Sequence, residues 1–197
     1  NAIAEGLLNR LKALSPAARR KLGGYGQSDY DRWTAIAQRN NLSIRTLQIL
    51  TDVRFTYLFS EQKERSSDLG QFSQVWYAVM EDQLQAIRTN AILQTIQLPA
   101  NGLSQSSGVL NVGQAKVYIV RLEKDQSVQL TLQAPAQSTQ LSIYAPDQSS
   151  DRALVENSTN LTWSGKMPQS GYYEIVIVST APETVGYQLK LSQLAEG

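Results

Sequence analysis

The residue types available for chemistry are limited in this chain, because its 197 residues include no histidine and no cysteine. The commonest general base, the commonest metal ligand and the thiol nucleophile are therefore all missing. Carboxylates remain, and Glu123, Glu156 and Glu174 all lie in the second half of the chain. Residue type alone leaves paired-carboxylate glycosidase chemistry open. Scattered surface acids explain these residues more simply, so we expect no catalytic residue and no enzyme activity in this segment.

Three short motifs suggest chemistry, but each lacks the rest of its pattern. Asp68–Gly70 matches a variant of the kinase metal-binding tripeptide, yet no Gly-rich strand-loop-strand precedes it and no histidine exists for a catalytic loop. Gly23–Gly26 has the glycines of a phosphate loop but neither the preceding strand nor the Lys-Ser/Thr ending. Asp147 and Asp151 lie close together on a polar turn, where carboxylates are usually solvated. The sequence therefore predicts no cofactor and no metal site.

Charge and hydropathy narrow the range of partners. The formal net charge of +1 provides no field that would steer the chain to nucleic acid. No run approaches the roughly 18 consecutive apolar residues that a membrane helix needs. We expect any contact with a membrane to run through a segment outside this sequence.

The first half of the chain shows helical periodicity and helix-capping residues. Ser15 followed by Pro16 predicts one helix start, and Ser28 and Ser43 predict two more. Leu42 and Leu47 flank Ser43 at the spacing of a hydrophobic staple. The clearest helix places one apolar stripe on a single face, made of Phe72, Val75, Trp76, Val79, Met80, Leu84 and Ile87. Short connections between such helices favour an antiparallel bundle.

The second half changes to the two-residue alternation of half-buried strands. Six short runs separated by turn residues are typical of an antiparallel sandwich; they are 116–122, 127–134, 139–145, 160–166, 171–179 and 185–192. The alternation assigns inward-facing sets within these runs: Val128, Leu130 and Leu132; Leu141 and Ile143; Tyr173, Ile175 and Ile177; and Tyr187, Leu189 and Leu191. A register slip of one residue would expose all of them to water.

The change of periodicity near residue 100 predicts an α+β protein with two segregated domains. We expect a helical bundle over residues 1–96, a linker over 97–108 that includes the polar break at Pro99–Gly108, and an antiparallel, jelly-roll-like β-sandwich over 109–197. Each half is long enough to bury a core of its own.

The second half resembles the bacterial pre-peptidase C-terminal (PPC) domain. Four runs carry the resemblance: Gly108–Val120, Asp125–Leu132, Leu141–Asp147 and Trp163–Ile177. Its strongest part is the spacing of Pro168, Gly171 and the aromatic strand that follows. The resemblance implies an exported jelly-roll-like sandwich. The calcium ligands of some family members have no convincing match here.

The first half resembles the helical tail of certain cyanobacterial membrane-anchored serine/threonine kinases, through Asp29–Trp33, Asn41–Leu47, Leu50–Phe59 and Gln74–Ala78. This resemblance implies an extracytoplasmic sensor segment for signal transduction, periplasmic or at the cell surface. It would be tethered by an upstream membrane helix, with the kinase module elsewhere in the protein. The alternative interpretation is a secreted wall- or polysaccharide-binding accessory module of a hydrolase.

A recognition surface would need side chains that the core does not use. At the inward positions of Tyr173 and Tyr187 we expect the aromatic rings to fill the core. Tyr144 and Tyr172 fall on the outward phase of their strands, and Glu174 lies beside them. These three residues are the candidate contacts for an unidentified protein, peptide or glycan ligand.

Overall fold

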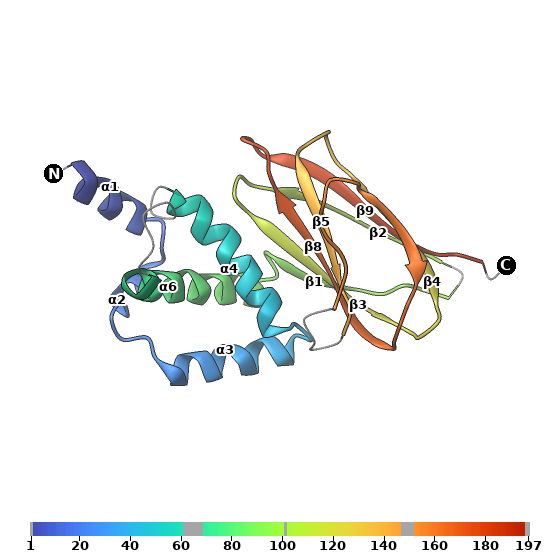
Figure 1. Cartoon of the computed structure of the whole chain (residues 1–197), viewed down its shortest axis with the longest axis horizontal. Helices are drawn as coiled ribbons and strands as arrows, with labels where there is room; N and C mark the ends of the chain where they lie inside the picture. The colour runs from blue at the N-terminus through green and yellow to red at the C-terminus, as the bar shows by residue number, and fades with distance from the viewer. Residues whose placement is uncertain (1, 61–68, 101, 147–151, 196–197) are drawn as a thin grey trace. The chain divides into compact units, whose positions relative to one another are not determined.

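The computed structural model describes residues 2–60, 69–100, 102–146 and 152–195. Contacts between Cα atoms divide the chain into two units, Asn1–Ala91 and Ile92–Gly197. Helices make up the first unit and two sheets make up the second (Figure 1), as an α+β protein requires. Asp68, Asp147 and Asp151 lie outside the described residues.

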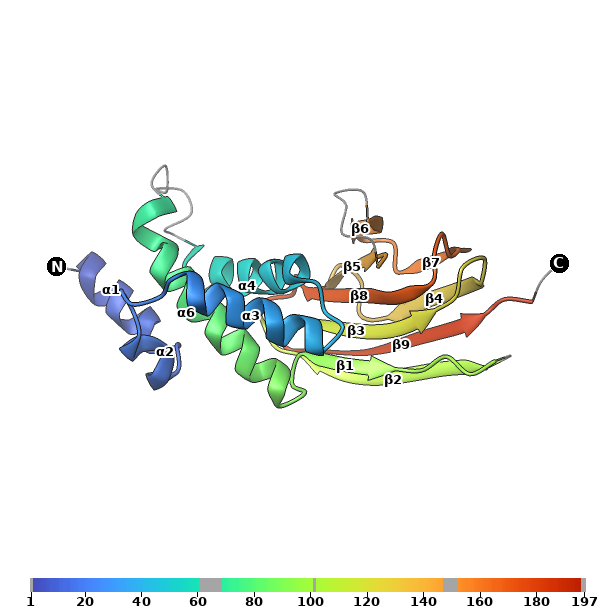
Figure 2. The same ribbon diagram turned by 90° about the horizontal axis from the view of Figure 1, so that it is seen from below.

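Five helices occupy the described part of the first unit: α1 (Ala2–Leu11), α2 (Pro16–Arg20), α3 (Gln27–Arg39), α4 (Ile44–Leu58) and α6 (Leu69–Arg88). α6 is the central element, because α2, α3 and α4 all pack against it (Figure 2). The predicted stripe on α6 is buried at Val79, Met80, Leu84 and Ile87. Trp33 of α3 and Leu47 of α4 are also fully buried.

Two of the three predicted helix starts are confirmed. The Ser15 hydroxyl accepts a hydrogen bond from the Ala18 backbone N–H at 3.1 Å, with Pro16 as the first helical residue. Ser43 likewise accepts one from the Arg45 backbone N–H at 3.0 Å. The start predicted at Ser28 is wrong by two residues, since α3 begins after Gly26. The cause is Asp29, whose carboxylate accepts the Gly26 backbone N–H at 3.0 Å and closes the first turn earlier.

Nine strands among the described residues of the second unit form two sheets. The five-stranded sheet has the order β1-β3-β8-β5-β6, and the four-stranded sheet has the order β2-β9-β4-β7. All neighbours are antiparallel except β1 and β3. The bounds are β1 (Leu93–Ile96), β2 (Leu103–Leu110), β3 (Ala115–Leu122), β4 (Ser127–Gln133), β5 (Thr139–Tyr144), β6 (Ala153–Ser158), β7 (Thr162–Lys166), β8 (Gly171–Ser179) and β9 (Val185–Gln193).

The core of the second unit confirms the predicted faces. Every residue assigned inward on β4, β5, β8 and β9 belongs to one buried cluster, which also contains Tyr118 and Val120 of β3. The Tyr118 and Tyr187 hydroxyls lie 2.6 Å apart inside it, so each is the other's hydrogen-bond partner.

Three strands were not predicted. β1 lies in the range assigned to the helical half, β2 lies partly in the predicted linker, and β6 lies between the predicted runs 139–145 and 160–166. β2 is an edge strand of the four-stranded sheet, and Ser104–Ser107 are all polar, so its first half has no hydrophobic alternation. β1 has four residues, too few to show a period. The division into domains 1–96 and 109–197 stays a prediction.

Candidate functional site

Tyr172 is the predicted contact residue that lies on an open surface, with 36% of the residue exposed. It is the second residue of β8 and pairs with Arg121 near the end of β3. Because paired residues project from the same face of a sheet, the two side chains lie together. The Arg121 guanidinium carbon is 5.8 Å from the centroid of the Tyr172 ring, a cation–π contact.

The β3–β4 turn is fixed to the segment that precedes β8, which determines where Tyr172 stands. The Lys124 backbone N–H donates to the Ser170 hydroxyl at 2.8 Å, and the Asp125 N–H donates to the Met167 carbonyl at 2.9 Å. Asp125 adopts a left-handed backbone with φ of 68°, a conformation that Asp tolerates better than most residues. These bonds hold one end of the sandwich in a single arrangement.

Beside Tyr172 lies a groove of about 480 Å³, and all of its lining residues belong to the second unit. Besides Tyr172 and Arg121, its lining residues include Gln97, Gln126 and Gln193. Gln126 uses both ends of its amide: its oxygen accepts the Glu123 backbone N–H at 3.0 Å, and its nitrogen donates to the Gln193 amide oxygen at 3.3 Å. We call this feature the Tyr172 groove.

Sequence reasoning identified Tyr172 but missed Arg121 and the three glutamines of the Tyr172 groove. Arg121 could have been found, since it stands on the outward phase of a predicted strand. The glutamines come from the ends of β1, β4 and β9, which meet only through tertiary pairing, so no local spacing indicates them.

Tyr144 and Glu174 are on the outward phase, as predicted, but the expectation that they lie on an open surface is wrong. Their exposed fractions are 4% and 3%. The reason is Arg152, which precedes β6. Its guanidinium lies 4.3 Å from the centroid of the Tyr144 ring and donates to a Glu174 carboxylate oxygen at 2.8 Å. The arginine therefore covers both residues, and their role as ligand contacts stays a prediction.

Glu156 and Glu123, the other two acids considered for glycosidase chemistry, also have protein partners. The Tyr144 hydroxyl donates to Glu156 at 2.8 Å. Burial, reinforced by this hydrogen bond, raises the pKa of Tyr144 to about 12, so the phenol stays protonated at neutral pH. Glu123 forms an exposed ion pair with Arg121 at 3.3 Å. Among the described residues, no group of three or more acidic side chains could hold a metal ion.

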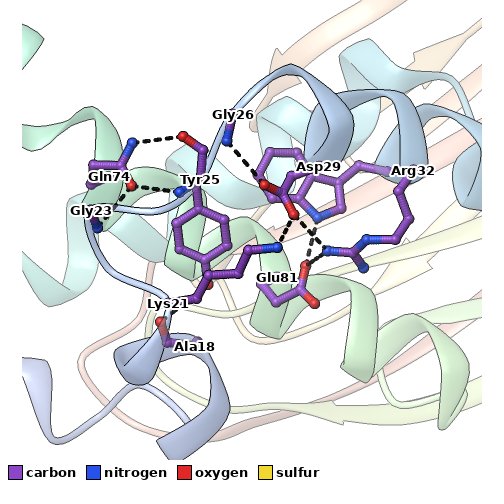
Figure 3. Close-up of polar contacts among 10 residues, drawn as sticks. Ala18, Lys21, Gly23, Tyr25, Gly26, Asp29, Arg32, Gln74 and Glu81 are labelled. Carbon is purple, nitrogen blue, oxygen red and sulfur yellow. Dashed lines mark hydrogen bonds and ion pairs between the residues drawn. The ribbon is translucent and has the colours of Figure 1, made fainter.

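The helical unit contains a second polar cluster, which the sequence reasoning missed. Figure 3 shows Asp29 of α3 between the side chains of Lys21 and Arg32, and it forms an ion pair with each. Arg32 also forms an ion pair with Glu81 of α6, at 2.7 Å. The Trp33 indole N–H also donates to Glu81, at 2.6 Å. The cluster joins the α2–α3 segment to the central helix.

The charges in this cluster hold one another in their ionised forms. Burial raises the pKa of Asp29, but hydrogen bonds from Lys21, the Gly26 backbone and Arg32 outweigh it, and the net pKa is lowered. For Glu81, burial is likewise outweighed by hydrogen bonds from Arg32 and Trp33, and the pKa is lowered. All these groups are occupied by one another, so the arrangement supports a structural role.

Gln74 of α6 adds a second connection between the same elements. Its amide oxygen accepts the backbone N–H groups of Gly23 and Tyr25, each at 3.0 Å, and its nitrogen donates to the Tyr25 carbonyl at 3.0 Å (Figure 3). The glycine-rich segment thus binds a side chain of its own protein through its backbone. Gly23–Gly26 therefore belongs to the connection between α2 and α3.

Comparison with known proteins finds one similar curated sequence. No family model matches the chain. The chain is 28% identical over 191 residues to serine/threonine-protein kinase-like protein E of Synechocystis sp., an alignment that covers 94% of this chain and 31% of that protein. The chain thus spans about a third of the length of this relative. None of the described helices combines the length and apolar content needed to cross a membrane.

The solved structures that match about half of this chain include two bacterial proteins. The periplasmic g-type lysozyme inhibitor PliG of Aeromonas hydrophila is 19% identical, with a TM-score of 0.43, and the match covers 52% of this chain and 98% of that one. The PPC domain of Bacillus anthracis collagenase is 10% identical, with a TM-score of 0.40, and the match covers 51% of this chain and 94% of that one. The chain is therefore similar to part of a Synechocystis kinase-like protein, and a PPC domain is among the solved structures that match about half of it, so each sequence resemblance has a counterpart among known proteins.

Proposed function

We propose that this chain is a non-catalytic, extracytoplasmic sensor or interaction segment of a larger bacterial membrane protein related to serine/threonine kinases. The observation that carries the proposal is the alignment with the Synechocystis kinase-like protein. It runs through both the helical and the sandwich half of this chain but through only 31% of the relative. An accessory region of a larger protein is expected to align in this way, over its own length but over only part of its relative.

The chemistry of the described side chains supports recognition. The buried carboxylate Glu174 is paired with Arg152, and Asp29 is paired with Lys21 and Arg32. Both carboxylates are buried and paired with cations, so neither is placed to exchange a proton with a substrate. The Tyr172 groove instead offers an exposed ring and amide groups, which are binding groups.

Signal reception would require two arrangements of the protein with different affinities for the ligand. A ligand that binds both arrangements equally shifts nothing, however tightly it binds. In the proposed mechanism, occupation of the sandwich biases the helical unit, which passes the change as a rigid body to an upstream membrane helix and kinase module.

The test is a deletion in the full-length protein that carries this chain. Removing residues 92–197 is expected to change autophosphorylation in isolated membranes, compared with the intact protein and with the surface variant Gly186→Ala. Equal phosphorylation in all three, across all growth conditions tried, would contradict the sensor role.

The alternative, a polysaccharide-binding accessory module of a hydrolase, is favoured by one observation, the exposed Tyr172 ring beside three glutamine side chains. The two proposals predict different neighbouring domains in the full-length protein that contains this chain. A kinase module with a membrane span supports the sensor, and a hydrolase supports the accessory module.

A further inference from the structure

We propose that the Tyr172 groove binds an uncharged oligosaccharide. The inference rests on the proposed function, since it names the ligand class of that recognition surface. It is argued from three properties of the groove: its aromatic ring, its amide groups and its charge balance.

The ring of Tyr172 is both available and held in place. It keeps 36% exposure while Arg121 packs over it at 5.8 Å. Binding to a ring that is already positioned costs little conformational entropy. The flat C–H faces of a pyranose are apolar and match an aromatic face, whereas the hydroxyl groups at the sugar's rim remain free for hydrogen bonds.

The amide groups of the groove are arranged to meet such hydroxyls. Gln126 orients Gln193 by donating to its amide oxygen, so the Gln193 nitrogen has its hydrogens available and finds no partner among the described residues. Gln97 is exposed and lines the same groove. A primary amide both donates and accepts hydrogen bonds, as a sugar hydroxyl does. A preoriented amide therefore pairs with a hydroxyl without leaving a polar group unsatisfied.

The charges of the groove exclude strongly charged ligands. Its cation and its anion, Arg121 and Glu123, form an ion pair at 3.3 Å, with side chains that are 55% and 62% exposed. At longer range the electric fields of two opposite charges this close together nearly cancel, and salt screens the residual field. A polyanion or polycation finds no net attraction here, which favours a neutral glycan over nucleic acid or an acidic peptide.

The test is calorimetric titration of the whole chain with cellohexaose, maltohexaose and chitohexaose as neutral probes. Hexagalacturonate serves as the charged comparison, and a Gly-Ser hexapeptide as the peptide comparison. We expect at least one neutral hexasaccharide to bind, and Tyr172→Ala to weaken it about tenfold, the upper end of what one aromatic contact contributes. Tyr172→Phe should bind nearly as well, because it keeps the aromatic face.

The matched control is Tyr57→Ala, which removes an exposed tyrosine of α4 (48% exposed) from the helical unit and should leave binding unchanged. Circular dichroism establishes that each variant is folded. Absence of binding by every neutral probe, or binding that survives Tyr172→Ala, would overturn the proposal, as would preference for the charged or peptide probe. Sugar binding without any effect of the deletion on phosphorylation would uphold the groove and refute the sensor; the reverse result would refute only the groove.

Discussion

At the scale of single residues, the Arg152–Glu174 pair carries the highest cost if broken. Both side chains are about 5% exposed or less. Replacing Arg152 with Met removes the cation and leaves the Glu174 carboxylate buried beside an apolar group. We expect a loss of about 3–5 kcal/mol in the stability of the sandwich. Hydrogen exchange of the β8 amides measures this loss without interference from the helical unit.

Two further variants separate the pair from surface charge effects. The double variant Arg152→Met, Glu174→Leu should recover most of the lost stability, because it removes both buried charges. Arg121→Met removes an arginine from an exposed pair and should change stability by less than about 0.5 kcal/mol. If all three variants behaved alike, the pair would not be the source of the stability.

The Asp29 cluster predicts that acid destabilises the helical unit. The folded pKa values of Asp29 and Glu81 are below their ordinary values. Stability from a lowered pKa is fully present above the unfolded value, about 4 for these acids, and is lost as the pH falls through the lower folded values. We therefore expect helical-unit amides to exchange faster as the pH is lowered from 5 to about 2, after correction for the intrinsic exchange rate.

A variant comparison assigns this pH dependence to the cluster. Asp29→Asn should lower stability at pH 7 and flatten the acid dependence, since the neutral amide cannot form the ion pairs with Lys21 and Arg32. The control is Asp31→Asn on the same helix, where the carboxylate is exposed and accepts from Gln27. An acid slope that persists in Asp29→Asn would show that other groups cause it.

At the scale of elements, β2 passes unusually close to a core side chain of its neighbour β9. Gly108 pairs with Tyr187, and a Cβ at Gly108 would lie 2.7 Å from the Tyr187 Cζ atom. Tyr187 cannot swing aside freely, because it is 5% exposed and its hydroxyl is bonded to Tyr118. Gly108→Ala should therefore destabilise the sandwich by about 1–3 kcal/mol, as measured by β9 amide exchange.

The same pair of strands supplies the control. A Cβ at Gly186 of β9 would meet no atom within 4 Å. Gly186→Ala should be neutral or stabilising by a few tenths of a kcal/mol, because alanine restricts the unfolded chain more than glycine does. Equal effects of the two substitutions would mean that strand propensity, and not the contact with Tyr187, sets the cost.

The strands also show how much of the fold could be predicted from the sequence. β4 and β9 were predicted with their faces because their burial alternates along the strand, which forces the two-residue alternation of the sequence. The inward residues of β5 and β8 were predicted too, although both faces of these strands are largely buried. β2 is polar over Ser104–Ser107, and β6 has its apolar residues in one run, Ala153–Val155, so neither strand shows the two-residue alternation. At the site, Tyr172 was predicted from its phase, whereas the burial of Tyr144 and Glu174 depends on Arg152, a residue from outside their strands.

At the scale of the whole molecule, the two units are stabilised by separate sets of interactions. The Asp29 cluster lies entirely within Asn1–Ala91, and the bonded Tyr118–Tyr187 pair lies entirely within Ile92–Gly197. If each half is a domain with its own core, as the sequence predicts, the chain departs from two-state unfolding and shows two thermal transitions. Differential scanning calorimetry measures both.

The variants above assign the two transitions. Asp29→Asn should lower the midpoint of one transition and leave the other in place, and Gly108→Ala should do the reverse. A change of about 1 kcal/mol shifts the midpoint of a domain of 60–100 residues by roughly 4–8 °C, which calorimetry resolves easily. Lowering the pH should move the transition that Asp29→Asn moves, because the lowered pKa values of Asp29 and Glu81 belong to the helical unit. A single transition that shifts with both variants would instead mean that the chain folds as one cooperative unit, and the boundary near residue 100 would then mark a change of secondary structure within one domain.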